Sequence, residues 1–360
     1  MSKEKNTNAA SFAELAVERR RQATKNNFLH QIDSIVDWRP ISNLLNKHCL
    51  KGDTPFGASS YRPIMLFKIL LLETWYGLSD RQVEERINDS LTWSAFLGLT
   101  MDFVSPDHST ICRFRQELIE KGLMAKLFKL LNKQLKQHGI MEIKEGAIVD
   151  ASIVDSPNKP TGGLQIVICD DREDTRSDQE KEAEEEYQVK VCSTKPGVDE
   201  EARWVKKCNE YRYGYKKHIL TDTKGLIHEV ITTAANVADT TQIIPLLEQA
   251  QLPQETMILA DKGYTSKKNR GYLCDHNLID GIMHKAVKGM PLTDGKKQLN
   301  RLISSMRWQI ERSFGSIIRW FHGGRCRYRG IAKTHYQNLI ESLAYNLKRA
   351  PKLLMQQNVN

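Results

Sequence analysis

The stretch GAIVDASIVD, residues 146–155, constrains the fold of this chain more than any other. It predicts a β-strand. Its apolar pairs at 148–149 and 153–154 place apolar side chains on both faces, because successive side chains of a strand point to opposite sides. Neither face is then suited to water. The stretch also carries Asp150 in its middle, and a buried carboxylate is costly unless it is protonated, paired or bound to a metal.

The second half of the chain mixes strand and helix patterns. Apolar and β-branched runs predict strands at 146–154, 213–222, 226–236, 255–261 and 280–287. Helical stretches are expected between or after them, at 240–251, 265–275, 297–320 and 333–349. The residues TKG at 223–225 predict a hairpin between two of the strands. Strands mixed with helices, including a hairpin, indicate an α/β fold with a mixed sheet.

The first half of the chain predicts helices without strands. Pro63 suits the start of a helix that is apolar nearly all round and ends at Gly77. Ser79 and Gln82 then form a capping-box pattern at the start of a second helix. Residues 91–99 predict a third helix.

A fourth helix is expected to begin with Ser109 as its cap and to bury an apolar stripe. Arg113 and Arg115 are expected to point away from that stripe. Short helices joined by tight turns, the last one exposing arginines, resemble a helix-turn-helix DNA-binding module. Most helix pairs of this kind are only packing units, so spacing alone leaves both interpretations open.

These patterns divide the chain into four parts. They are a basic N-terminal arm or loosely held helix (1–55), a helical domain that holds the candidate DNA-binding module (56–140), an α/β domain (141–347) and a C-terminal tail (348–360). An acidic insertion loop is expected at about 156–200, where Asp, Glu, Ser, Pro and Gly predominate, as is typical of a solvated segment.

The charge of the chain favours a polyanionic partner. Net charge is +9 with a pI near 9.1, although residues 170–186 alone hold ten acids against three bases. The remaining residues carry 50 Lys and Arg against 34 Asp and Glu, which suits nucleic acid binding. A basic protein that is merely soluble is the alternative.

The cysteines and the N-terminus indicate an intracellular protein. The seven cysteines are scattered and never spaced C-x-x-C, so they predict neither a disulfide framework nor a zinc site. The N-terminus has no apolar signal-peptide core, and the longest apolar run is broken by Lys68. We expect a cytoplasmic protein, associated with the nucleoid when bound to DNA, and no membrane partner.

Two further carboxylates stand in unusual places. Asp261 ends an apolar strand and is followed by Lys262 and Gly263, where α/β sheets place ligand-binding groups. Glu311 lies beside the apolar stripe of an amphipathic helix, one turn after Arg307. Taken singly, the aspartate suits a turn or helix cap, and the glutamate suits an ion pair with Arg307.

Together, Asp150, Asp261 and Glu311 predict a metal site. Like charges a few ångströms apart raise one another's pKa, and a divalent cation removes that conflict. Mg²⁺ or Mn²⁺ binds carboxylates and phosphate oxygens, and two ions about 3.5 to 4 Å apart stabilise an in-line displacement at phosphorus. Three other acids are expected to be structural: Asp239 as a helix cap, Asp155 at a strand end and Asp222 in the hairpin turn.

The combination of motifs over roughly residues 60–347 resembles the DDE transposases of the IS5 family of bacterial insertion sequences. The motifs are the helical run at 62–99, SPDHSTICRFRQEL, IVDASIV, ARWVKKCNEYRYGYKKHI, ANVADTT, ADKGY and RWQIERSFGSIIRWF. The resemblance implies an RNase H-like core and a catalytic and metal-binding triad of Asp150, Asp261 and Glu311.

Around the glutamate the chain departs from the family pattern of Tyr, Arg, Glu and Lys. Arg307 and Glu311 match that pattern, but Ser304 stands at the tyrosine position and Ile318 at the lysine position. Arg319, next to it, is a candidate replacement. DNA contacts made by that Tyr and Lys in the family are then expected to be made differently.

The resemblance implies a transposase that binds terminal inverted repeats, cuts by metal-activated water and joins the freed 3′-OH to target DNA, working as a dimer that pairs two ends of double-stranded DNA. The expected DNA contacts are Arg113, Arg115, Lys206, Lys207, Lys216, Lys217, Lys262, Arg307, Arg319, Arg325, Arg327 and Arg329. A non-catalytic, domesticated DNA-binding regulator and a hydrolytic nuclease on the same fold are the alternatives.

Overall fold

The computed structural model describes residues 27–49, 61–99, 103–144, 146–160, 197–207, 209–286 and 291–357. The start of the expected N-terminal arm, residues 1–26, and most of the acidic insertion, residues 161–196, lie outside the described residues.

Helices precede a mixed α/β part, as expected. The first half holds α2 (Phe28–Ile35), α3 (Trp38–Cys49), α4 (Pro63–Tyr76), α5 (Asp80–Asp89), α6 (Leu91–Leu97), α7 (His108–Glu120) and α8 (Leu123–Gln137). The strands are β1 (Ala147–Asp155), β2 (Arg203–Lys207), β3 (Glu210–Asp222), β4 (Ile227–Ala234), β5 (Met257–Ala260) and β6 (Ile279–Ile282). The later helices are η1 (Asp239–Thr241), α9 (Ile243–Ala250), η2 (Lys262–Tyr264), α10 (Lys267–Asp275), α11 (Asp294–Phe321) and α12 (Ile331–Gln357).

The strands form one mixed sheet in the order β2-β3-β1-β5-β6, with β4 also paired to β3. β3 is antiparallel to β1, β2 and β4, whereas β1, β5 and β6 run parallel. The predicted hairpin joins β3 and β4, and Gly225 in its turn has a φ of +79°, which favours glycine. A Cβ there would also crowd the hydroxyl of Ser313.

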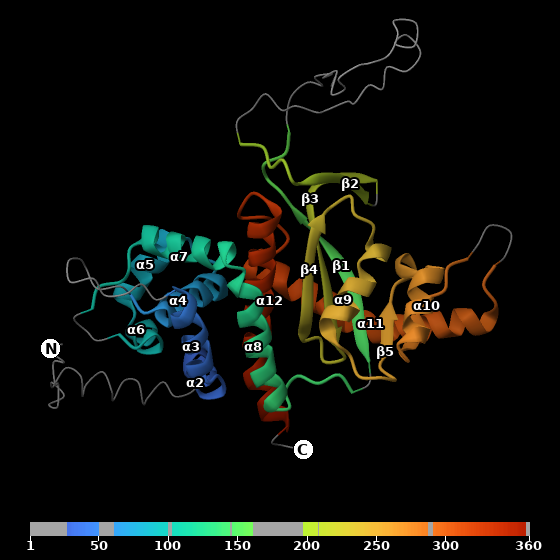
Figure 1. Ribbon diagram of the computed structural model, residues 1–360, viewed down its shortest axis with the longest axis horizontal. Coiled ribbons are helices and arrows are strands. Elements are labelled where there is room, and N and C mark those ends of the chain that lie inside the picture. The colour runs from blue at the N-terminus through green and yellow to red at the C-terminus, as the bar shows by residue number, and fades with distance from the viewer. Residues whose placement is uncertain are drawn as a thin grey trace, which may run out of the picture.

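Helices cover both faces of β1, which explains its apolar pairs. Ile148 belongs to a large core shared with the N-terminal helices, α11 and α12, whereas Val149 belongs to a second core with residues of α9 and α10. Figure 1 shows α8 and α12 standing between the N-terminal helices and the sheet. By strand alternation Asp150 follows on the face of Ile148, toward α11.

The N-terminal helices begin and end close to the predicted positions. Pro63 starts α4, Gly77 ends it in a left-handed conformation, and Ser79 and Gln82 form a complete capping box on α5. The expected cap Ser109 is wrong. Asp107 caps α7 instead, accepting from the backbone N–H groups of residues 109 and 110, because a carboxylate two residues earlier reaches both donors.

Two terminal segments are more ordered than expected. Residues 28–49 were predicted to be part of an arm or a loosely held helix, but they form two helices, whose Leu29, Ile32, Ile41 and Leu45 are buried in the main core. Residues 348–357 were predicted to be a tail, but they continue α12 through Pro351. Both segments bury apolar side chains against distant helices, which local sequence does not reveal. None of the described helices is long and apolar enough to cross a membrane.

Candidate active site

Asp150 lies where β1 separates from β5. The parallel pairing of the two strands ends at Val149 and Ala260, the residues directly before Asp150 and Asp261. Strand pairing therefore delivers two carboxylates, distant in sequence, to one end of the ladder. The amide of Ala151 donates to Asp150 Oδ1 at 2.8 Å, and the amide of Lys262 donates to Asp261 Oδ1 at 2.7 Å.

Arg307 lies between the two carboxylates. Its Nη2 is 2.8 Å from Asp150 Oδ2, and its Nη1 is 3.8 Å from Asp261 Oδ1. Only 10% of the Arg307 side chain is exposed, against 24% for Asp150 and 42% for Asp261. The sequence predicted Arg307 as a partner of DNA phosphate or of Glu311, and its partners in the structure are the two aspartates.

The electrostatics of Asp150 reflect this arrangement. Burial raises the pKa of the Asp150 carboxyl group above its ordinary value. The Arg307 guanidinium and the Ala151 amide oppose that rise, and the neighbouring Asp261 carboxylate adds to it. The two aspartates are therefore a like-charged pair held by one cation.

Glu311 lies one turn beyond Arg307 on α11 and is exposed. Ile303, Ile310 and Ile317 form a buried apolar stripe along this helix. Glu311 lies at the edge of that stripe. Within the described part of the chain, no group of three or more His, Cys, Asp and Glu side chains lies close enough to hold a metal ion. The structure thus brings together two of the three predicted carboxylates.

The donor chemistry of the aspartate pair suits a hard divalent cation. Mg²⁺ in proteins is bound by one or two carboxylates, with water and substrate phosphate filling the other positions. Asp150 and Asp261 converge on one positive group, Arg307, and Asp261 remains partly open to solvent. We therefore regard these two residues as able to hold such an ion.

Tyr264 and Asp239 lie beside the pair, and sequence reasoning assigned neither a place there. The Tyr264 side chain is buried, and its hydroxyl has no hydrogen-bond partner among the described residues. Burial, and next the Asp150 carboxylate, raise the pKa of Tyr264 well above its ordinary value. Asp239 is not the predicted helix cap, because it starts η1 and lies 2.9 Å from Lys216 Nζ. The motifs ADKGY and ANVADTT were the available signals.

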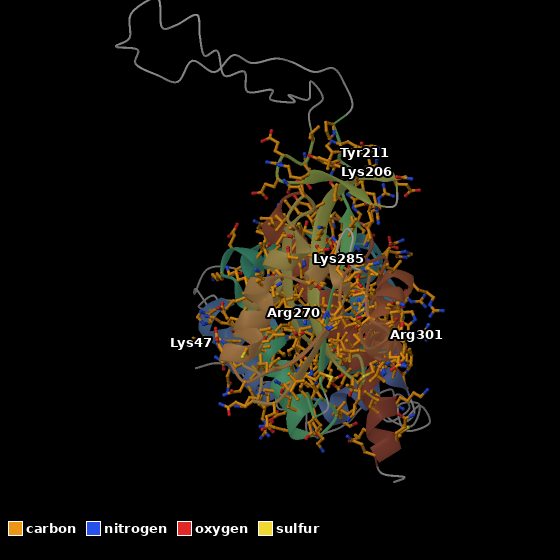
Figure 2. All side chains as sticks on the ribbon, turned by 90° about the vertical axis from the view of Figure 1, so that its right-hand side faces the viewer. Lys47, Lys206, Tyr211, Arg270, Lys285 and Arg301 are labelled. Carbon is orange, nitrogen blue, oxygen red and sulfur yellow. The ribbon has the colours of Figure 1, made fainter. Side chains whose placement is uncertain are left out.

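Most of the expected DNA contacts are exposed. They are Arg113, Lys206, Lys207, Lys262, Arg319, Arg325, Arg327 and Arg329. Figure 2 shows Lys206 together with Lys285 and Arg301 on the side of the molecule that carries the sheet and α11. Long basic side chains that reach solvent are suited to phosphate contacts, but the Arg327 guanidinium lies 3.7 Å from Glu73 and its side chain is only 29% exposed.

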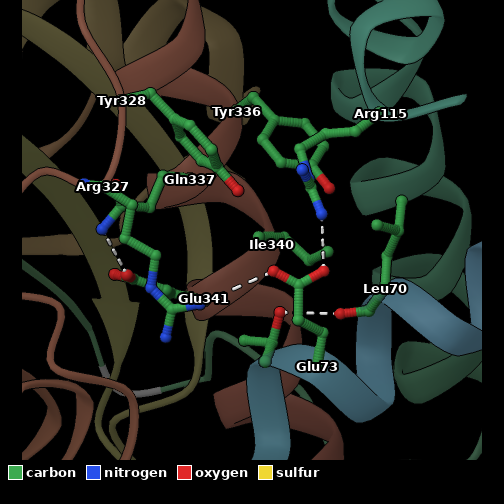
Figure 3. Close-up of a pocket in the computed structure, with 10 residues that line it drawn as sticks. Leu70, Glu73, Arg115, Arg327, Tyr328, Tyr336, Gln337, Ile340 and Glu341 are labelled. Carbon is green, nitrogen blue, oxygen red and sulfur yellow. Dashed lines mark hydrogen bonds and ion pairs between the residues drawn. The ribbon is translucent and has the colours of Figure 1, made fainter. Parts of the chain in front are cut away.

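Lys217 and Arg115 were expected to be exposed, and both expectations are wrong. Lys217 is 1% exposed and pairs with Glu341 of α12 at 3.0 Å. Arg115 is buried, lies 2.7 Å from Glu73 of α4 and also pairs with Asp80. Figure 3 shows Arg115 reaching Glu73 between α4, α7 and α12. Both cations are buried with acidic partners, Glu73 and Glu341, that lie far away in the sequence. The pattern of the helix or strand that carries each cation therefore did not reveal its burial.

Comparisons with known proteins identify the family. A family model described as "Transposase DDE domain" matches residues 143–347, and one described as "Transposase domain (DUF772)" matches residues 17–117. A curated relative, "Transposase for insertion sequence element IS1106" of Neisseria meningitidis serogroup B, is 35% identical over 257 residues, which cover 71% of this chain and 82% of that protein.

Two solved structures are also similar at low identity. The "Mos1 Strand Transfer Complex" has 12% identity and a TM-score of 0.19, covering 84% of this chain and 81% of that one. The "Mos1 transposase paired-end complex with left transposon end" has 11% identity and a TM-score of 0.20, covering 85% and 82%. TM-scores this low do not indicate a shared fold. The family model spans more than half of the sequence, and the chain therefore belongs to the transposase DDE domain family.

Proposed function

We propose that this protein is an insertion-sequence transposase of the IS5 family that cuts DNA at terminal inverted repeats and joins the freed ends to target DNA. Its core is proposed to be RNase H-like, which the antiparallel β1, β3 and β4 followed by parallel β5 and β6 support. Asp150, Asp261 and Glu311 are the proposed catalytic residues, and the protein pairs two ends as a homodimer.

One observation carries the proposal: Asp150 and Asp261 meet at a single cation, Arg307. A carboxylate with a purely structural role is usually neutralised by a hydrogen-bonding or cationic partner of its own. Two aspartates at the divergence of parallel strands, sharing one guanidinium, form instead a concentrated negative site that a cation must neutralise. The site lies open to solvent on the side of Asp261, where a DNA phosphate has access.

In the proposed mechanism Asp150 and Asp261 would hold a pair of Mg²⁺ or Mn²⁺ ions, and Glu311 would complete the ligand set from α11. The ions would activate the attacking water or 3′-OH and neutralise charge developing on the phosphate. Arg307 faces both carboxylates in the metal-free site, and it would contact the DNA phosphate once metal ions are bound. The exposed basic residues, with Lys216 beside β1, hold the DNA backbone. The buried Lys217 and Arg115 are not among them.

Cleavage and joining by purified variants test this proposal. The substrate is duplex DNA carrying the element ends, taken from the sequence flanking the gene, with Mg²⁺ or EDTA added. We expect the wild type to cut and join only with Mg²⁺. Asp150→Ala, Asp261→Ala and Glu311→Ala should each lower both steps by more than about 100-fold, consistent with loss of a metal ligand.

Asp155→Ala is the matched control, because Asp155 lies on the same strand but pairs with Arg212. It should cut and join normally. Undiminished joining by folded Asp150→Ala would remove the metal-site proposal. Binding without cutting by the wild type would favour the domesticated regulator, and cutting without joining would favour a hydrolytic nuclease.

A further inference from the structure

β2 and the first residues of β3 form a two-stranded ribbon that β1 does not pair with. β2 pairs with Glu210 to Gly214, whereas β1 pairs with β3 from Gly214 onward. The two pairings meet at Gly214. Glycine is needed there because a Cβ would collide with the carbonyl oxygen of Val154. Figure 1 shows β2 lying across the end of the sheet.

One face of the ribbon presents aromatic rings to solvent. The register pairs Trp204 with Tyr213 and Lys206 with Tyr211, so these four side chains share a face. Trp204 is 43% exposed and Tyr211 is 69% exposed. Lys206 Nζ lies 5.5 Å from the Tyr211 ring centroid, and Figure 2 shows the two residues together at one end of the molecule.

The ribbon also forms a basic hollow beside the candidate active site. A hollow of about 190 Å³ is lined by residues 151–153, directly after Asp150, and by Val205, Lys206, Lys207, Lys216 and Asp239. Lys216 pairs with Asp239 at 2.9 Å and donates to the Val237 carbonyl, so Lys206 and Lys207 supply the positive charge that suits the hollow to a polyanion.

Exposed rings beside a basic hollow match the surfaces that bind unpaired nucleotides. Bases within a duplex are stacked on one another, so their faces are not available to protein rings. In single strands every base has a free face for an aromatic ring, while lysines contact the backbone. We propose that the ribbon holds an unpaired DNA strand leading into the Asp150–Asp261 site, with Trp204 and Tyr211 stacking on its bases and the exposed Lys206 and Lys207 contacting its phosphates.

This inference rests on the proposed function for its place in the reaction, but its test needs no catalysis. The probes are a 12-nucleotide single strand of mixed sequence and the duplex of the same sequence, titrated in EDTA with fluorescence anisotropy. Trp204→Ala and Tyr211→Ala should each weaken single-strand binding by at least about fivefold, in the range expected for one stacked base. Duplex binding should change less than about twofold.

Three further variants sharpen the test. Trp204→Phe should keep single-strand affinity, because a phenyl ring still stacks. Tyr76→Ala, which removes an exposed aromatic ring on α4, should change nothing. Lys206→Ala should weaken binding and flatten its salt dependence by about 0.7 in the log–log slope, the value for one lost contact to a single strand.

Two results would overturn the proposal. One is unchanged single-strand affinity in Tyr211→Ala, whose side chain is mostly exposed and is not needed for the core. The other is an equal loss of single-strand and duplex affinity in both aromatic variants. Asp150→Ala separates this inference from the proposed function, because it should abolish cutting while binding the single strand normally.

Discussion

At the scale of single residues, Arg307 offsets the electrostatic repulsion between Asp150 and Asp261. A single guanidinium faces both carboxylates, with Asp150 the nearer at 2.8 Å. Burial raises the pKa of Asp150 and Arg307 lowers it, so the charged form of Asp150 depends on a cation. A divalent cation held as proposed would favour the same charged form.

Arg307→Ala should therefore destabilise the protein in a pH-dependent way. Without the guanidinium the pKa of Asp150 should rise further in the folded protein. Above that pKa the buried carboxylate is charged and lowers the free energy of unfolding. As the pH falls and the carboxyl group becomes protonated, this loss of stability disappears. Urea unfolding at pH 7 and pH 4 should show a larger loss at pH 7. An equal loss of stability at both pH values would contradict the predicted pH dependence. Added Mn²⁺ should increase the stability of the variant more than that of the wild type.

Glu73 provides a second residue-scale test, away from the site. Its burial raises its pKa to about 7, against the lowering effect of Arg115, from an ordinary value of 4.5. Since the folded state then holds the proton more tightly, this group makes stability fall as pH rises from about 4.5 to about 7. Glu73→Gln should flatten that slope in urea unfolding. The exposed Glu120→Gln should leave it unchanged, and a wild-type slope in Glu73→Gln would refute the assignment.

At the scale of elements, buried ion pairs fix β3 and α7 against neighbouring helices. Lys217 of β3 pairs with Glu341 of α12, and Glu341 also accepts from Gln337 at 2.8 Å. Arg115 of α7 pairs with Glu73 of α4 (Figure 3). The first contact joins α12 to the sheet that carries Asp150, and the second joins two of the N-terminal helices to each other.

Lys217→Met should cost roughly 3–5 kcal/mol of unfolding free energy, because it leaves Glu341 buried without its cation. The double variant Lys217→Met, Glu341→Met should regain most of that loss. Lys129→Met removes a lysine whose side chain is 55% exposed, and it should cost less than about 1 kcal/mol. Urea denaturation measures all three, and a double variant as unstable as Lys217→Met would contradict the buried pair.

The sequence predicted elements whose patterns are local and missed those that depend on partners. The strand of Asp150 and the hairpin at 223–225 follow from apolar runs and a turn glycine. β2 was missed because RWVKK is largely exposed and has few apolar residues. α8 was not assigned, and α2 and α3 lie in the segment predicted to be an arm or a loosely held helix, because their buried faces are completed only by other helices.

The same reasoning explains the outcome for the site residues. Asp150 and Asp261 were predictable as a pair because each ends or interrupts an apolar strand. Arg115 and Lys217 were misassigned as exposed because Glu73 and Glu341 lie elsewhere in the sequence. The position of Arg307 between the two aspartates depends on how α11 crosses the sheet, which no local pattern specifies.

At the scale of the whole molecule, exposed basic residues on the sheet side should govern DNA affinity. Arg325→Ala combined with Arg329→Ala should weaken duplex binding and reduce the log–log salt slope by about 2, since each phosphate contact contributes about 0.9. The double variant at Lys217 and Glu341 should leave that slope unchanged, because Lys217 is buried. Anisotropy titrations over a range of NaCl concentrations measure both, and a slope that changes only in the Lys217 variant would contradict the assignment.

The central claim is that Asp150 and Asp261 share a divalent cation. Calorimetric titration of Mn²⁺ into the protein, with element-end DNA bound, tests it most directly. The wild type and Asp155→Asn should bind Mn²⁺ with the same affinity and stoichiometry, while Asp150→Asn and Asp261→Asn should each lose that binding. Wild-type binding by either Asp150→Asn or Asp261→Asn would contradict the claim.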